Sequence, residues 1–331
     1  MFSAEIIRAR KIIDSSISSL SLDLNGKTVL TEVGSNNYLF TPLIPALAGA
    51  SEVIAWTKDT RFGQSDDIIA KCTEIAKIWG VESKITFRKN SRDWRDVSKA
   101  DIITNSGMIR PISSELVGYM KPEAVVPLMF EAWEIRESDI DVQACKLRGI
   151  KVAGTWENHP KLKVFEYTGI LALKLVLNAG IEVFDSTILV WSNDHFGETA
   201  ALAFETNRAK RVILTTNIEK FEEELPYLDA IFLCDYHVNQ PLLGKTGLFN
   251  IELIKNINPG LSIIHLYGSV DADFVRNHNI SLFPNRNGFA HVMTETLGYV
   301  GLEPILRLQV AGFAVASELE SDNISDLTQI I

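Results

Sequence analysis

The stretch DSTILVWSNDHFGETAALAF, residues 185–204, has the outline of a β-strand, a tight turn and a helix of small residues. This succession opens the nucleotide-binding units of doubly wound α/β folds. Their turns carry several glycines, because a glycine backbone can approach a diphosphate closely. Here the turn runs from Ser192 to Gly197 and has glycine only at its last position. The stretch therefore predicts the frame of a nucleotide-binding domain without its usual phosphate contacts.

Strand and helix patterns alternate along the rest of the chain, which indicates parallel sheets covered by helices. Helical patterns cover segments such as 65–80 and 139–149, and the second half of the chain repeats the element order of the first. Apolar runs predict strands at 27–33, 52–57, 84–89, 100–106, 124–130, 150–155, 187–192, 211–216, 229–235, 261–267 and 279–283. The predicted fold class is α/β, with two Rossmann-like doubly wound parallel-sheet domains and a cleft between them.

We place the domain boundary at residue 160. Residues 1–160 form a substrate-type Rossmann-like domain, and residues 161–300 form a second one, a degenerate dinucleotide-binding domain. A long helix over 159–185 is expected to join them, and a helix over 301–320 is expected to return to the first domain. The last residues, 321–331, are expected to be frayed or lightly packed.

Composition limits the class of partner. The 331 residues carry a formal net charge of -10, which argues against general binding to nucleic acid or anionic membranes. Cys72, Cys145 and Cys234 lie far apart, so we expect buried thiols in a reducing compartment. The sequence has neither a signal peptide nor a run of about 18 apolar residues. We therefore expect a cytoplasmic protein that binds a small-molecule metabolite.

Four segments carry a resemblance to a known family: NSGMIRPISSELVGYMKP (105–122), ESDIDVQACKLRGIKVAGT (137–155), VFEYTGILALKLVLNAG (164–180) and residues 225–271. Their order resembles that of the D-2-hydroxyacid dehydrogenases, the formate and glycerate dehydrogenase superfamily. The resemblance implies an NAD(P)-dependent oxidoreductase that forms a homodimer. It places cofactor contacts at Asn193, Asp194, His195, Phe196, Gly197 and Thr215.

Departures from the family pattern fall on functional residues. The family's acidic ribose ligand is absent, since Thr215, Thr216 and Asn217 stand at that strand end. Tyr267 and Gly268 replace the family's catalytic Arg-Gly pair, and a phenol cannot clamp a carboxylate as a guanidinium does. Three alternatives stay open: NAD(P) binds weakly or in a changed pose, no cofactor binds, or binding has moved to the EVGSNNY turn at 32–38.

Histidines stand at or just past predicted strand ends, where side chains face the crevice of a doubly wound sheet. Such imidazoles can move protons near neutral pH, although a lone histidine at a strand end often only bonds to the backbone. We predict no metal site, because neither HxH nor HxxxH spacing occurs. The candidate catalytic residues are His291, His237, His265, Tyr267 and Arg286.

Substrate contacts are expected at polar and aromatic residues that follow the strands. In the first domain, residues 34–37 form a polar turn whose backbone amides could face an anion. The candidate substrate-binding residues are Arg110, Glu131, Trp133, Glu134, Trp156 and Asn287.

The leading functional hypothesis is a divergent oxidoreductase-like enzyme of small-molecule metabolism. It would act on a polar, anionic metabolite in the cleft between the domains. Two alternatives remain: a non-catalytic metabolite sensor or partner protein, and a cofactor-free lyase, isomerase or transferase that uses the histidines.

Overall fold

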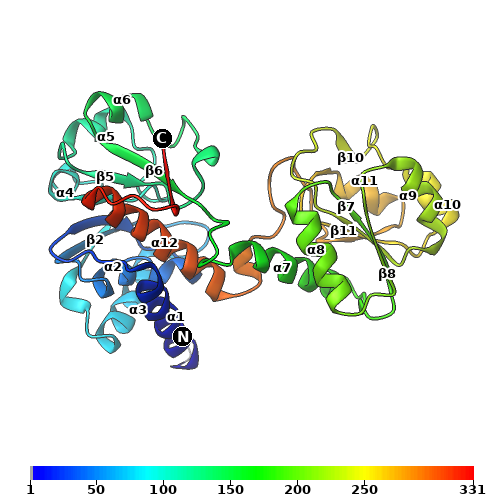
Figure 1. Cartoon of the computed structure of the whole chain (residues 1–331), viewed down its shortest axis with the longest axis horizontal. Helices are drawn as coiled ribbons and strands as arrows, with labels where there is room; N and C mark the ends of the chain where they lie inside the picture. Colours follow the sequence, from blue (N-terminus) through cyan, green and yellow to red (C-terminus); the bar gives the residue numbers. More distant parts are fainter. Residues whose placement is uncertain (1–2) are drawn as a thin grey trace. The chain divides into compact units, whose positions relative to one another are not determined.

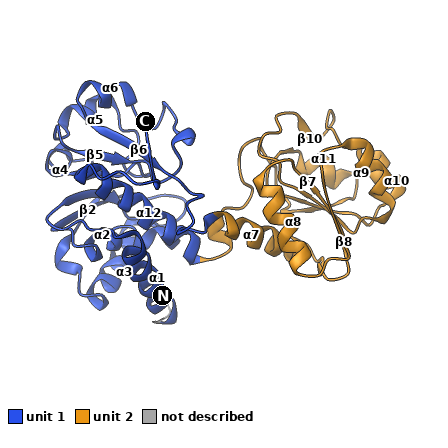
Figure 2. Ribbon diagram, viewed as in Figure 1, with its two compact units in different colours: residues 1–164, 302–331 blue, residues 165–301 orange. Residues whose placement is uncertain are grey.

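The computed structural model describes residues 3–331 and divides them into two compact units (Figures 1 and 2). Unit 1 contains the chain up to Val164 together with Leu302–Ile331, and unit 2 is Phe165–Gly301. Each unit is an α/β domain with its own mainly parallel sheet, so the predicted fold class is confirmed. No helix within residues 3–331 has the length and apolar character that a membrane crossing requires.

The sheet of unit 1 has seven strands in the order β14-β6-β5-β4-β1-β2-β3. All neighbours are parallel except β14 and β6, which are antiparallel. The strands are β1 Thr28–Glu32, β2 Glu52–Thr57, β3 Ile85–Lys89, β4 Ile102–Ile103, β5 Val125–Pro127, β6 Lys151–Thr155 and β14 Thr328–Ile330. The strand order reverses between β1 and β4, because the chain winds outward from β1 in both directions.

Helices cover both faces of this sheet. They are α1 Ser3–Leu20, α2 Leu43–Leu47, α3 Ser65–Ile78, α4 Trp94–Lys99, α5 Ser114–Tyr119, α6 Val142–Leu147 and α12 Leu302–Ser321, with short 3₁₀ turns η1 Asn36–Phe40, η2 Glu82–Lys84 and η3 Ala132–Glu134. Helix α12 packs against α1, β5 and β6 within unit 1.

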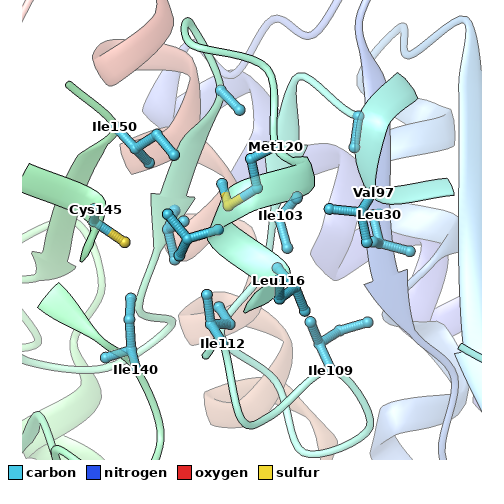
Figure 3. Close-up of a cluster of buried hydrophobic side chains, with 14 of the residues drawn as sticks. Leu30, Val97, Ile103, Ile109, Ile112, Leu116, Met120, Ile140, Cys145 and Ile150 are labelled. Atoms are coloured by element: carbon cyan, nitrogen blue, oxygen red, sulfur yellow. The ribbon is translucent and has the colours of Figure 1, made fainter. Parts of the chain in front are cut away.

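Alternate strand residues build the core of unit 1. Leu30 and Ile103 pack with Val97, Leu116 and Cys145 from helices α4, α5 and α6 (Figure 3). The side chains between them, such as Val29 next to Leu30, point to the opposite face, because side chains alternate along a strand. The apolar runs in the sequence reflect this burial on both sides.

The sheet of unit 2 has five parallel strands in the order β13-β11-β9-β7-β8. Its strands are β7 Thr187–Trp191, β8 Arg211–Thr215, β9 Ala230–Leu233, β11 Ser262–His265 and β13 Ser281–Phe283, and the short strands β10 Pro241–Leu243 and β12 Ser269–Val270 form a separate pair. Its helices are α7 Val164–Asn178, α8 His195–Thr206, α9 Ile218–Glu224, α10 Ile251–Ile257 and α11 Ala272–Asn277, with 3₁₀ turns η4 Leu225–Tyr227 and η5 Leu297–Tyr299.

Two sequence-based expectations about single elements are wrong. The long helix expected over 159–185 is the shorter α7, Val164–Asn178, which ends just before Gly180 at a positive φ of 88°. The last residues are not frayed, because Thr328–Ile330 forms β14 on the edge of the unit 1 sheet. There Gln329 pairs with Gly154, and its side-chain Oε1 accepts a hydrogen bond from the Ala132 N–H at 2.8 Å.

Candidate functional site

Unit 1 has a cavity of about 520 Å³ where its strand order reverses. Residues at the carboxyl ends of β1, β2 and β4 contribute to its wall, and this end of such a sheet is where ligands bind. Its lining residues are Glu32, Gly34, Ser35, Tyr38, Thr41, Lys58, Thr60, Phe62, Asn105, Ser106, Gly107, Met108, Arg110, Met129, Phe130, Ile305, Leu308 and Gln309.

Glu32 ends β1 with its side chain 7% exposed. One carboxyl oxygen, Oε2, accepts a hydrogen bond from the Met108 N–H at 2.9 Å. Burial raises the pKa of Glu32 above its ordinary value, although the N–H groups of Met108 and Gly107 and the charge of Arg110 oppose this. A carboxyl of raised pKa in a cavity wall is suited to proton transfer.

Two buried amide side chains also line the cavity. Asn105 is 0% exposed and uses its Oδ1 to accept a hydrogen bond from Arg110 Nε at 2.9 Å. Gln309 is 6% exposed and uses its Oε1 to accept one from Thr41 Oγ1 at 3.2 Å. Within residues 3–331 the side-chain N–H groups of Asn105 and Gln309 have no hydrogen-bond partner. Unpaired buried donors are costly, and a ligand with acceptor atoms would remove that cost.

The loop after β1 differs from the polar turn expected there. The N–H of Gly34 donates to the Tyr38 carbonyl oxygen at 3.2 Å, so it is not available to an anion. A Cβ at position 34 would lie 2.9 Å from the Tyr38 Cβ, which explains why glycine occupies this position. The turn therefore brings Tyr38 into the cavity wall.

Arg110, a predicted substrate contact, does line the cavity. Its guanidinium group forms a salt bridge with Asp139 at 3.1 Å and lies 5.2 Å from the centre of the Phe130 ring. Because these contacts hold the group in place, Arg110 can orient a ligand without first losing side-chain entropy.

The other substrate candidates of unit 1 gather outside this cavity. Glu131 accepts hydrogen bonds from the Glu157 N–H at 3.1 Å and from Trp133 Nε1 at 2.5 Å, and Trp156 is exposed. Burial raises the pKa of Glu134 above its ordinary value. Burial, followed by the charges of Glu134 and Glu131, raises the pKa of Glu157 to about 8.

Glu157 gives a pH-dependent prediction. Its pKa rises from 4.5 to about 8 on folding, so the folded state binds the extra proton between these values and stability falls as pH rises across this window. Replacing Glu157 with glutamine should raise the free energy of unfolding by about 1–3 kcal/mol at pH 9, allowing for partial exposure, and leave it nearly unchanged at pH 4.5. Urea unfolding at both pH values measures this, with the exposed Glu115→Gln as control. An equal effect at both pH values would contradict the shifted pKa.

In unit 2 the turn after β7 places a carboxylate at the N-terminus of α8. Asp194 Oδ1 accepts hydrogen bonds from the N–H groups of Phe196 at 2.9 Å and Gly197 at 3.3 Å. Its Oδ2 accepts one from the Tyr236 N–H at 2.7 Å. These helix donors are the groups that receive a diphosphate in dinucleotide-binding folds. The Asp194 carboxylate therefore occupies the place at the start of α8 where a bound anion would otherwise be stabilised.

Gly197 keeps the packing role of the family's third glycine. A Cβ there would lie 2.5 Å from the Ser192 Cβ and 3.0 Å from Leu214 Cδ1, so only glycine lets α8 pack closely against the strands. Thr215, another predicted cofactor contact, accepts a hydrogen bond from the Asn217 N–H at 3.0 Å. His195 lies in the first turn of α8, exposed, with Nδ1 3.2 Å from Glu198 Oε2.

Three predicted catalytic residues come together around Tyr236. The ring centre of Tyr236 lies 5.4 Å from that of His237, 5.4 Å from that of Tyr267 and 5.0 Å from that of His291. His291 Nε2 also lies 2.9 Å from Asn239 Oδ1. Phe196 packs against the same group with its ring tilted, and its ring centre lies 4.9 Å from that of Tyr267. The histidines therefore belong to an aromatic cluster that lies over the start of α8.

The remaining candidates of unit 2 have structural contacts. His265 is 0% exposed rather than in a crevice, and its Nε2 lies 2.8 Å from the Pro284 carbonyl oxygen. Burial lowers the pKa of His265 to about 4, so the imidazole is neutral at physiological pH. Arg286 pairs with Glu295 at 2.7 Å, and Asn287 Oδ1 accepts a hydrogen bond from the Ala272 N–H at 2.9 Å.

A second cavity, of about 390 Å³, lies at the strand ends of unit 2, and Asn193 and His237 are in its wall. Its other lining residues are Trp191, Thr216, Ile218, Asp235, Val238, Gln240 and Leu248. Neither lysine nor arginine appears among them, so this cavity lacks the cations that commonly bind phosphate groups. No group of three His, Cys, Asp or Glu side chains within residues 3–331 is arranged to hold a metal ion.

Comparisons with known proteins agree with the fold. A dipicolinate synthase structure from Bacillus subtilis superposes with a TM-score of 0.57 at 10% identity, over 91% of this chain and 99% of that chain. NAD-dependent formate dehydrogenase from Staphylococcus aureus, solved with NAD, superposes with a TM-score of 0.52 at 11% identity, over 92% of this chain and 98% of that chain. The chain shares the fold of these enzymes.

The corresponding dipicolinate synthase structure from Bacillus halodurans gives a TM-score of 0.53 at 13% identity, over 87% of this chain and 96% of that chain. The resemblance inferred from the sequence is thus confirmed at the level of the fold. No family model and no curated protein matches the sequence.

Sequence reasoning missed Glu32, Asn105 and Gln309 as cavity residues. Glu32 did leave a signal, since it is a charged residue at the end of an otherwise uncharged strand. Asn105 left a weaker one, because it follows β4 closely. Gln309 left none, since it lies in the middle of α12 and reaches the cavity only through the tertiary fold.

Proposed function

We propose that this protein is an enzyme of small-molecule metabolism that binds a polar metabolite in the unit 1 cavity and uses Glu32 as its acid or base. The observation that carries the proposal is the buried carboxyl group of Glu32 in the same cavity wall as two unpaired amide N–H groups, where the strand order reverses. Largely preformed cavities with a few convergent polar groups are typical of such sites. The fold likeness to metabolic enzymes supports this class of function.

The formate dehydrogenase structure contains NAD. A dinucleotide of this kind does not fit unit 2 in the usual pose. Its diphosphate would require the N–H groups of Phe196 and Gly197, which Asp194 already occupies. The negative charge of Asp194 would also repel it. We therefore assign no step to a dinucleotide and favour the cofactor-free alternative.

The cavity residues would have different roles in binding and proton transfer. A raised pKa lets Glu32 keep a proton at a pH where an ordinary carboxyl has lost it, so Glu32 can donate a proton to a bound metabolite and take one back. Arg110 would orient an oxygen-bearing group, and the amide groups of Asn105 and Gln309 would bind acceptor atoms.

A thermal-shift screen tests the proposal. It would use four ligand classes: 2-oxo and 2-hydroxy acids, amino acids, nucleosides and sugars. We expect at least one compound to raise the midpoint by mass action, and the rise to disappear in Glu32→Gln. Mass spectrometry of that compound after incubation should then show turnover by the wild type only.

Glu52→Gln is the matched control, because Glu52 lies at the opposite, amino end of the neighbouring strand β2. It should bind the same compound as the wild type does. Ligand binding that is unchanged in Glu32→Gln, or the absence of any ligand in all four classes, would refute the site.

A further inference from the structure

Unit 1 has the more complete nucleotide-type sheet of the two units. Counted along the chain, its first six strands have the order 3-2-1-4-5-6, which is the order of two joined mononucleotide-binding halves. Unit 2 lacks a counterpart of the strand beyond β8 on that edge. In sheets of this order, ligands bind at the carboxyl ends where the order reverses, and the 520 Å³ cavity lies there.

The cavity wall combines apolar side chains with polar ones. Its apolar side chains include Phe62, Met108, Met129, Phe130, Ile305 and Leu308. Such a wall can cover both faces of a flat ring, and hydrogen-bonding groups at its edge can then fix the orientation of that ring.

The polar groups require two kinds of partner in one ligand. The Glu32 carboxyl accepts hydrogen bonds from the N–H groups of Met108 and Gly107, and a carboxyl group has further acceptor positions for hydroxyl donors. The amide N–H groups of Asn105 and Gln309 require acceptors such as ring nitrogens or carbonyl oxygens. A sugar diol and a heteroaromatic base supply these two kinds of group.

Two N–H groups of the same loop are already bonded within the chain, which favours a ligand without phosphate. The Gly34 N–H is bonded to Tyr38, and Tyr38 N–H to the Ser35 carbonyl oxygen at 3.2 Å. The turn η1 that follows has only five residues, and Arg110 is paired with Asp139. Lys58 lines the cavity too, but it is exposed to water.

We propose that the unit 1 cavity binds a nucleoside, whose sugar hydroxyls donate to Glu32 and whose base accepts from Asn105 and Gln309. This rests on the proposed function, since it assigns a ligand class to the same cavity. It is related to one alternative left open by the sequence, namely that cofactor binding has moved from unit 2 to the turn after β1.

Isothermal titration of the full chain with adenosine, guanosine, uridine and cytidine tests the inference. We expect at least one to bind with a Kd below about 1 mM, and its 2′-deoxy or 3′-deoxy analogue to bind about tenfold to a hundredfold more weakly, because a hydrogen bond to the buried carboxyl group of Glu32 is lost. Glu32→Gln should reduce the difference between nucleoside and deoxynucleoside to less than about threefold.

Gln309→Met is a second variant, in case Glu32→Gln fails to fold, because methionine keeps the unbranched shape and removes the N–H donor. It should weaken nucleoside binding about tenfold, whereas Glu52→Gln should bind as the wild type does. Glu32-dependent binding of another ligand class without any nucleoside would overturn this inference and leave the proposed function standing. If no ligand binds in a Glu32-dependent way, both are wrong.

Discussion

Replacing Gly154 with alanine is expected to lower the free energy of unfolding by about 3 kcal/mol or more. Gly154 lies in β6, and a Cβ there would be 2.4 Å from the Ala132 backbone nitrogen and 2.8 Å from its Cα. Both neighbours are backbone atoms, so they cannot move aside as a flexible side chain can. The variant must displace η3 or distort the edge of the sheet, which urea unfolding at neutral pH would measure.

Gly118→Ala is the matched control for this variant. Gly118 lies in α5, exposed, and a Cβ there would meet nothing within 4 Å. Because alanine is the better helix former by about 1 kcal/mol, this control should be as stable as the wild type or more so. If Gly154→Ala is as stable as the wild type, η3 does not lie against β6.

Replacing Asp194 with glycine should increase affinity for NAD at least about tenfold, because it removes a charge and frees two N–H groups at the start of α8. The wild type should show no saturable binding of NAD or NADH at concentrations of about 1 mM. Loss of the cap should cost only about a few tenths of a kcal/mol, and loss of the acceptor for the Tyr236 N–H should cost about 1 kcal/mol more. Isothermal titration of both proteins provides the measurement.

Two variants separate the causes. Asp194→Asn keeps a capping oxygen but removes the charge and the acceptor for the Tyr236 N–H, so its affinity should lie between those of wild type and Asp194→Gly. Asp271 caps α11 by accepting a hydrogen bond from the Phe274 N–H. Asp271→Gly removes this cap and should leave the affinity for NAD unchanged. Wild-type binding as tight as that of Asp194→Gly would show that Asp194 is not the barrier.

Much of the fold could be predicted because it rests on local patterns. β7 reads TILVW and is buried along its whole length, so its apolar run predicts a central parallel strand. β14 could not be predicted, since TQI is short and partly exposed and becomes a strand only by pairing with β6. A pairing between elements so far apart leaves no periodic signal in either segment.

The candidate site was less predictable for a related reason. The sequence located the altered turn after β7, but local spacing could not show that the Asp194 side chain folds back onto the N–H groups of Phe196 and Gly197. His265 stands at a strand end as predicted, yet it is fully buried, and this burial keeps the imidazole neutral although the hydrogen bond with the Pro284 carbonyl oxygen opposes it. Side-chain direction and burial, rather than residue type, decide which of the predicted site residues can contact a ligand.

Unit 1 is assembled from two chain segments with the whole of unit 2 inserted between them, which sets an order of events during synthesis. Unit 2 is synthesised before α12 and β14, so it can begin to fold while unit 1 is still incomplete. At about 5–20 residues per second, the residues after β6 take on the order of ten to thirty seconds to synthesise. During that time the β6 edge has no β14 and the nascent unit 1 lacks α12, so the N–H and C=O groups on that edge stay open to pairing with other chains.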